Sequence, residues 1–252
     1  MKVKLTGNSH SVAIHNAYRE QKLDIGWEYF PFGGAAWETV PFSTIGEDGL
    51  VHFYEREYAI YVATLPGDLI FSHDLMWVLV CGTHTPRIYN HAFWFNSSPS
   101  HVAGEGARPV SEGLLDQIID ADLLHIRNFL SQMSATATPC VVVAAPPPRR
   151  DHPVFRYGVS KETVLAVDGR LRHRFRAMLE AFGLDFIEPP AEAFGDDGFL
   201  KAGLECLETH GRPDPHHAND IYGAMMLDKI RRYLDKRAAT DAVASSDASP
   251  AA

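Results

Sequence analysis

Residues 3–11 read VKLTGNSHS, an extended apolar stretch that ends in a Gly-Asn-Ser turn. The composition of residues 3–6 predicts a β-strand, and residues 11–21 have the apolar periodicity of a helix. Ser9 therefore stands at a strand-to-helix turn near the beginning of the chain.

Predicted strands and helices alternate along the rest of the sequence. An extended stretch at residues 23–32 ends at a glycine pair, and the runs LMWVLV at 75–80 and CVVV at 140–143 are typical of strands buried on both faces. Helical spacing covers residues 111–133, 160–182 and a final segment from about Asp214 to Leu234, and a last short strand is expected at 184–187. This alternation predicts a three-layer α/β/α sandwich with a mainly parallel, flavodoxin-like sheet.

The domain organisation follows from the same pattern. Residues 1–237 are expected to form one domain, with an extended insertion around 39–66 that is rich in aromatic and β-branched residues. Residues 238–252 are nearly all Ala, Ser, Asp, Thr and Pro, a composition that predicts a disordered tail.

Composition excludes several classes of function. The 252 residues carry 23 basic and 32 acidic side chains, a formal charge of −9, without a basic run, so a nucleic-acid partner is not expected. The three cysteines form no Cys-x-x-Cys pair, which argues against a disulfide framework or a thiolate zinc site. No apolar run has the length of a signal peptide or a membrane span, so we expect no membrane partner and a cytoplasmic location.

Ser9 can act as a nucleophile only with a base beside it, and residues 214–217, Asp-Pro-His-His, offer one. A separation of three residues would place Asp214 and His217 on one side of a single helical turn. Asp214 could then hold one imidazole nitrogen of His217 while the other faces Ser9, and His216 would point elsewhere.

These two blocks resemble the SGNH/GDSL hydrolase superfamily, in which a Gly-Asp-Ser turn lies near the N-terminus and an Asp-x-x-His motif near the C-terminus. Residues 218–223 (ANDIYG) are also similar to bacterial members, where Asn and then Tyr-Gly follow the catalytic histidine. The resemblance implies Ser9, Asp214 and His217 as the catalytic triad. Asn8 stands where Asp is commoner in the family.

The resemblance also implies an oxyanion hole built from the amide of Ser9, a glycine amide after the second strand and an asparagine side chain after the third. Gly33 or Gly34 fits the glycine position. The third block, CGTHT at 81–85, has no asparagine, and either Thr83 or His84 takes that place. If neither donates, Asn90 or Asn96 could, or the hole has two backbone donors.

Each motif also has a purely structural interpretation. A serine after Gly-x is a common helix N-cap, and Asp-x-x-His can cap a helix locally. His84, His91 and His101 have neither regular ligand spacing nor an acidic partner, so we expect separate polar histidines and no metal site.

The sequence therefore favours a serine esterase or deacylase that cleaves a small-molecule or glycan ester and needs no cofactor. An acyltransferase acting on a glycan or small metabolite would use the same acyl-enzyme. A non-catalytic binding protein on the same fold is the third hypothesis, motivated by the missing asparagine.

Overall fold

In the computed structural model, the described residues are 2–22, 26–33, 38–53, 69–84, 91–209 and 211–247. Their central sheet has five strands in the order β10-β9-β6-β1-β2, and every neighbouring pair is parallel. The strands are β1 (Lys2–Asn8), β2 (Trp27–Gly33), β6 (Leu75–Val80), β9 (Cys140–Val143) and β10 (Asp185–Ile187). Numbered within this sheet, the order is the 2-1-3-4-5 arrangement of flavodoxin-like folds.

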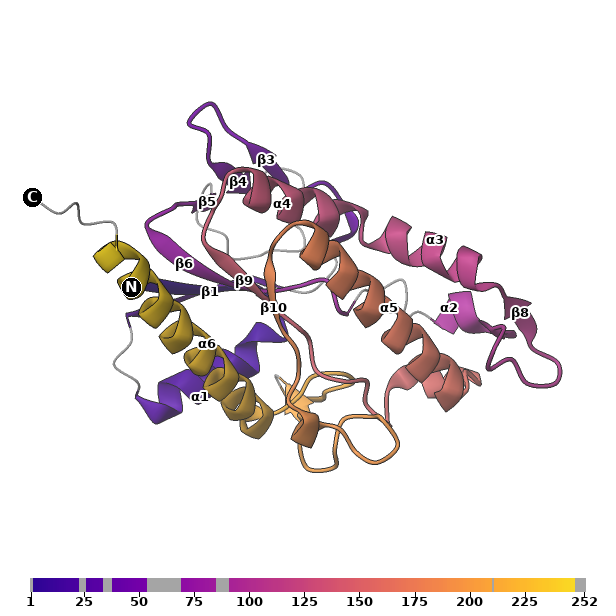
Figure 1. The fold of residues 1–252 in the computed structure, drawn as a ribbon. Helices are drawn as coiled ribbons and strands as arrows, with labels where there is room; N and C mark the ends of the chain where they lie inside the picture. The colour runs from indigo at the N-terminus through magenta and orange to yellow at the C-terminus, as the bar shows by residue number, and fades with distance from the viewer. Residues whose placement is uncertain are drawn as a thin grey trace, which may run out of the picture.

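Helices cover both faces of this sheet (Figure 1). One face carries α1 (Ser11–Gln21) and α6 (Asp220–Asp247), and the other carries α4 (Leu124–Ala135) and α5 (Lys161–Ala181), with α3 (Glu112–Asp122) against α5. Side chains of β6 alternate between the two cores: Val78 packs under α1 and α6, and Trp77 and Leu79 pack on the other side. The predicted three-layer α/β/α sandwich with a parallel sheet is confirmed.

Several elements begin and end where local chemistry requires. The hydroxyl of Ser160 accepts a hydrogen bond from the Thr163 amide at 3.1 Å and so caps α5. The hydroxyl of Ser111 caps α3 in the same way. The single periodic stretch at 111–133 forms two helices that meet at Leu123, whose amide still bonds the carbonyl of Ile119.

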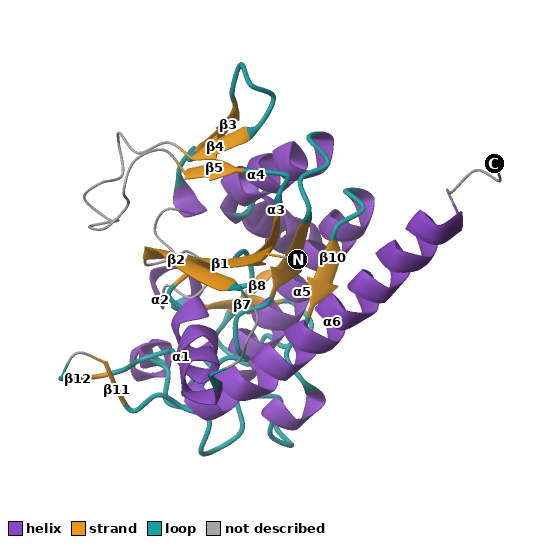
Figure 2. Ribbon diagram, turned by 90° about the vertical axis from the view of Figure 1, so that its left-hand side faces the viewer, coloured by secondary structure: helices purple, strands orange, loops and turns teal. Residues whose placement is uncertain are grey.

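The segment expected to be an insertion contributes a small antiparallel sheet of β3 (Ser43–Ile45), β4 (Val51–Phe53) and β5 (Leu69–Phe71). It stands beside α4 (Figure 2), where Phe42 and Phe71 contact Phe129 with ring centroids 5.2 and 5.1 Å apart. Residues 54–68 lie outside the described residues.

Shorter elements complete the described part of the chain. They are α2 (His91–Trp94), β7 (Ser97–Pro99), β8 (Arg108–Val110), β11 (Glu208–Thr209), β12 (Arg212–Pro213) and the 3₁₀ helices Pro153–Tyr157 and Ala191–Ala193. Among the described helices, none combines the length and apolar character that crossing a bilayer requires.

The C-terminal helix differs from the prediction at both ends. It begins at Asp220 and not near Asp214, because Asn219 caps it by accepting hydrogen bonds from the amides of Ile221 and Tyr222. It continues to Asp247, so the expected disorder is corrected for residues 238–247, where alanine favours the helix. Residues 248–252 lie outside the described residues.

Candidate active site

Ser9 lies where β1 ends and α1 begins, at the carboxyl edge of the sheet. Gly7 makes this turn possible: its φ is +140°, and a Cβ there would lie 2.2 Å from the carbonyl oxygen of Val80 in β6. The side chain of Asn8 is buried and accepts a hydrogen bond from the amide of His10 at 3.1 Å. Asn8 therefore shapes the turn, and the partly exposed Ser9 is presented at the surface.

Ser9, His217 and Asp214 form a continuous hydrogen-bonded chain. Nε2 of His217 lies 2.7 Å from Oγ of Ser9, and Nδ1 lies 2.8 Å from Oδ2 of Asp214. The Asp214 side chain is 1% exposed and the His217 side chain 20% exposed. The two residues do not share a helical turn as predicted, because they precede α6 in a loop that Asp214 itself organises.

Asp214 is held as a carboxylate. Its Oδ1 accepts hydrogen bonds from the amides of His216 and His217 at 3.0 and 2.8 Å, and its Oδ2 accepts one from the hydroxyl of Thr209. Burial acts to raise the pKa of Asp214, but these bonds and the one from His217 outweigh it and hold the pKa well below its usual range.

Arg149, which the sequence analysis did not single out, fixes the loop that carries His217. Its guanidinium is buried and donates to the carbonyls of Cys206 and His217 at 2.6 and 3.1 Å. It also pairs with Asp151 and lies 3.8 Å from Oδ1 of Asp214. No sequence motif marks it, because its partners lie at least 57 residues away apart from Asp151.

Glu38 is a second residue that the sequence analysis missed. It is fully buried, and its two carboxyl oxygens accept hydrogen bonds from the Asn8 side chain at 2.9 Å and from the Gly82 amide at 3.2 Å. Burial raises the pKa of Glu38 to about 8, although both hydrogen bonds oppose the shift. The carboxyl joins the turn at Asn8 to the segment that follows β6.

The expected oxyanion donors take different positions. Gly33 is the register partner of Asn8 in β2, one residue before Ser9, and Gly34 lies outside the described residues. Thr83 is fully buried, and its hydroxyl accepts a hydrogen bond from the Ala145 amide at 2.7 Å, so it links the ends of β6 and β9. Of Thr83 and His84, it is His84 that lies near His217. Its ring contacts the rings of His10 and His216, and each of these two rings contacts that of His217.

His84, expected to be a separate polar histidine, lies in a cluster of histidines around Ser9. The His84 ring stacks on His216 with centroids 5.2 Å apart and meets His10 at 4.7 Å, and the His216 ring lies 4.1 Å from that of His217. The imidazole that bonds Ser9 is that of His217, and the ring of His216 stacks on His84 instead. Three loops distant in sequence converge here, which the spacing along the chain does not reveal. His101 is distant and bonds Glu112, and the His91 side chain lies outside the described residues.

Burial disfavours the charged form of three of these imidazoles, those of His10, His84 and His216. It lowers the pKa values of His10 and His84 well below the usual range, with smaller contributions from neighbouring histidines, and lowers that of His216 to about 4. Both ring nitrogens of His10 are buried and have no hydrogen-bond partner among the described residues.

A cavity of about 410 Å³ opens beside Ser9 and His217. Its lining combines apolar and polar groups: Val12, Ala13, Asn16, Cys206, Glu208, Thr209, Ala218, Asn219 and Asp220, with Ser9, His10 and His217. Space of the size of a small ligand is therefore present beside Ser9.

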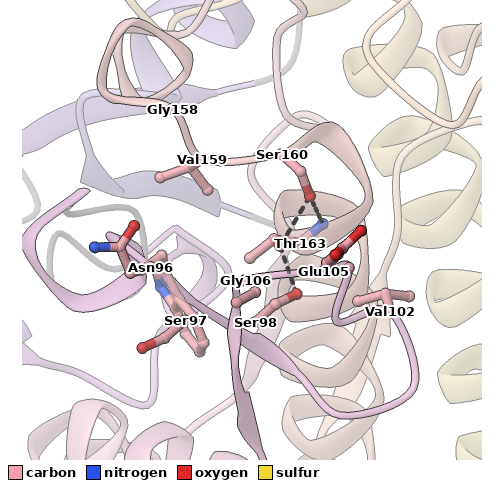
Figure 3. Close-up of a pocket in the computed structure, with 13 residues that line it drawn as sticks. Asn96, Ser97, Ser98, Val102, Glu105, Gly106, Gly158, Val159, Ser160 and Thr163 are labelled. Carbon is pink, nitrogen blue, oxygen red and sulfur yellow. Dashed lines mark hydrogen bonds between the residues drawn. The ribbon is translucent and has the colours of Figure 1, made fainter.

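A separate cavity of about 370 Å³ lies between β7 and the start of α5 (Figure 3). The hydroxyls of Ser98 and Ser160 bond that of Thr163 at 2.7 and 2.9 Å, and among the described residues no histidine lines this cavity. Asn96, considered as an oxyanion donor, lines this cavity and not the one beside Ser9. Asn90 lies outside the described residues.

Comparison with solved structures identifies the fold. A GDSL-like lipase from Bacteroides thetaiotaomicron superposes with a TM-score of 0.50 at 13% identity, over 94% of this chain and 88% of that one. A carbohydrate acetylesterase from Sinorhizobium meliloti gives 0.43 at 15% identity, over 95% and 100% of the two chains. The periplasmic domain of a Salmonella Paratyphi A lipopolysaccharide acetyltransferase gives 0.42 at 12%, over 93% and 84%. No protein-family model and no curated protein matches the chain. The chain has the SGNH/GDSL-like fold that its two end motifs predicted.

Proposed function

We propose that this protein is a serine acyl hydrolase whose nucleophile is Ser9, with His217 as general base and Asp214 as the carboxylate that orients it. The observation that carries the proposal is the chain of two hydrogen bonds, 2.7 and 2.8 Å long, that joins Ser9 to Asp214 through the two nitrogens of one imidazole. The same fold in a GDSL-like lipase supports it.

In the proposed reaction, Oγ of Ser9 attacks the carbonyl carbon of an ester while Nε2 of His217 takes its proton. The tetrahedral intermediate collapses, the C–O bond to the alcohol breaks, and His217 returns the proton to the leaving oxygen. Water then attacks the acyl-enzyme with the same base, which releases the acid and restores the Ser9 hydroxyl. Asp214 stabilises the imidazolium that forms in each half.

Negative charge on the carbonyl oxygen would be met by backbone donors. The amide of Ser9 precedes the first turn of α1, whose unpaired N–H groups give this end of the helix a partial positive charge. Gly33, at the end of β2 beside the turn, is proposed as the second donor. A ring N–H of His84 is proposed for the third position, where the family has an asparagine.

A fluorophosphonate probe tests the proposal directly, because it phosphonylates only a serine that a base activates. We expect stoichiometric labelling at Ser9 by peptide mapping, and none in Ser9→Ala or His217→Ala. Ser11→Ala is the matched control, since the Ser11 hydroxyl is buried and bonds the Asn8 carbonyl at 2.7 Å. Folded wild-type protein that remains unlabelled would favour the non-catalytic binding protein.

Acyl transfer to a sugar hydroxyl is the second candidate. Asn16, Glu208 and Asp220 in the cavity beside Ser9 offer hydrogen-bond partners that an acceptor with several hydroxyls requires. Adding a glycan acceptor to a p-nitrophenyl acetate assay should then divert the acyl group from water to the sugar, which mass spectrometry detects.

A further inference from the structure

Three histidines from separate loops converge at the carboxyl edge of the sheet. His10 follows β1, His84 follows β6, and His216 precedes α6, and their ring centroids are 4.7, 5.2 and 5.7 Å apart. One ring nitrogen of each lies within 4.8 Å of those of the other two. Nitrogens that share one tetrahedral zinc ion lie roughly 3.4 Å apart, so side-chain rotations that shorten these distances by up to about 1.5 Å complete the arrangement.

His10 is the residue that most needs an explanation. It is 5% exposed, and neither of its ring nitrogens has a hydrogen-bond partner among the described residues. Buried polar groups in native proteins are almost always paired, and an imidazole that lacks protein partners is available to a metal ion. Coordination would give one of its nitrogens a partner.

We propose that His10, His84 and His216 form a binding site for a divalent transition-metal ion of the zinc type. Imidazole nitrogen is a preferred ligand of Zn²⁺, Co²⁺, Ni²⁺ and Cu²⁺, and three histidines with a fourth position left for water or substrate form a recognised zinc arrangement.

A competing set of ligands also meets within 4.8 Å, namely Asp214, His216 and His217. It is the poorer site, because Asp214 already bonds His217, and His217 already bonds Ser9. A metal ion there would break these bonds, whereas His10 has none to lose. His216 belongs to both sets, so only His10 and His84 distinguish the first set from the second.

The proposed ion would lie beside the Ser9–His217 pair, since the rings of His10 and His217 are 4.9 Å apart. The site itself does not depend on the proposed hydrolase activity. Metal binding is measured without any substrate, so failure of one proposal leaves the other standing.

The experiment is a titration of chelator-treated full-length protein with Zn²⁺ by calorimetry, repeated with Co²⁺ to follow the visible bands of a tetrahedral site. We expect one equivalent to bind, with affinity at least about tenfold weaker in His84→Ala and in His10→Asn. His101→Ala, which alters an exposed histidine paired with Glu112, should bind as the wild type does. His217→Ala and Asp214→Asn should also retain binding within about threefold.

Two results would overturn the proposal. One is the absence of stoichiometric Zn²⁺ binding by the folded wild-type protein. The other is a loss of binding in His217→Ala and Asp214→Asn with full affinity in His84→Ala, which would assign the ion to the competing set. His84 follows the last residue of β6 by four positions and lies outside the strand, so its alanine variant still tests the site even if His10→Asn does not fold.

Discussion

Asp214 does more than orient one imidazole. Oδ1 organises the loop through two amides, and Oδ2 faces Thr209 and Nδ1 of His217. With the proton of His217 on Nδ1, Nε2 is left as the acceptor toward Ser9, which is the tautomer that a general base needs. The same carboxylate therefore fixes the backbone of the loop at residues 214–217 and the tautomer of His217.

Asp214→Asn separates these two tasks. The amide oxygen can keep the backbone bonds, while the NH₂ group turned toward Nδ1 would force the proton onto Nε2. We expect kcat for ester hydrolysis to fall by roughly 10³–10⁴ with little loss of folding. Turnover and thermal unfolding measured together check this. A variant that keeps more than about a tenth of wild-type turnover would show that His217 does not depend on Asp214 for its tautomer.

Arg149 is predicted to be a positioning residue. Arg149→Met retains much of the buried stem but leaves the carbonyls of Cys206 and His217 without their donor, so we expect a loss of roughly 3–5 kcal/mol of unfolding free energy. The loosened loop should lower kcat about 10–100-fold with a smaller change in KM. Arg150→Met is the matched control, because Arg150 forms an exposed pair with Asp197 that contributes about 1 kcal/mol or less. Equal effects of the two substitutions would remove Arg149 from this role.

At the scale of elements, Glu38 connects the ends of β1 and β6. Its pKa of about 8 in the folded protein lies above the ordinary 4.5, so between these values the folded state holds a proton that the unfolded chain releases. Its contribution to stability is therefore complete below about pH 4.5 and is lost as pH rises to about 8, at up to about 1.4 kcal/mol per pH unit.

Glu38→Gln keeps the shape and removes the titration. The free energy of unfolding of the variant, relative to that of the wild type, should increase from pH 5 to pH 9, by a few kcal/mol at most. Denaturant unfolding at pH 5, 7 and 9 measures the difference, with Glu192→Gln on the surface as control. A difference that stays constant with pH would mean that Glu38 titrates at its ordinary pKa.

The contact between α1 and α6 brings Ser9 and His217 together, because each residue lies just before one of these helices. It requires Gly223: a Cβ there would lie 2.0 Å from the carbonyl oxygen of Ala13, and backbone cannot yield as a side chain does. Gly223→Ala should therefore separate the helices and lower both stability, by about 1–3 kcal/mol, and turnover.

Gly169→Ala provides the opposite control. Gly169 is an exposed position inside α5 where a Cβ would meet nothing within 4 Å, so alanine should stabilise the protein by about 0.5–1 kcal/mol and leave turnover unchanged. Thermal unfolding and ester hydrolysis of both variants test the pair. If Gly223→Ala changed neither the stability nor the turnover, α1 and α6 would not need to lie this close together.

For the whole molecule, the sequence predicted the layers because buried strands leave an unmistakable pattern. The runs at 75–80 and 140–143 coincide with β6 and β9, since strands covered on both faces are apolar throughout. The start of α6 was predicted too early, because the chain has two capping side chains, Asp214 and Asn219, only five residues apart. Asp214 closes an isolated turn, and Asn219 is the true cap.

The surroundings of Ser9 were less predictable than its partners. The end motifs predicted that Ser9, Asp214 and His217 would meet, because each block is local in sequence, and hydrogen bonds join the three side chains in the structure. The contacts of Glu38 with Asn8, of Arg149 with Cys206 and of His10 with His84 join residues 30, 57 and 74 positions apart, and no periodicity in the sequence indicates them. Such contacts become visible only once the crossovers bring the loops to one edge of the sheet.

The hydrophobic cores on the two faces of the sheet determine how far the C-terminal helix can be shortened before the protein loses stability. The core under α1 and α6 takes its last buried side chains from Ile230 and Leu234, and residues 235–240 are exposed or half-buried. A chain ending at residue 240 keeps Ile230 and Leu234 of this core, so its free energy of unfolding should lie within about 1 kcal/mol of the full-length value and its turnover should be retained.

A chain ending at residue 228 should fail to fold. It lacks Ile230 and Leu234, whose removal costs roughly 2–5 kcal/mol each, and a domain of this kind has a net stability of only about 5–15 kcal/mol. Circular dichroism and thermal unfolding of the two truncated chains measure the difference. If the 240-residue chain also loses its cooperative transition, residues 241–247 of α6 carry part of the fold, and the alanine-rich end of the helix contributes more than its composition predicts.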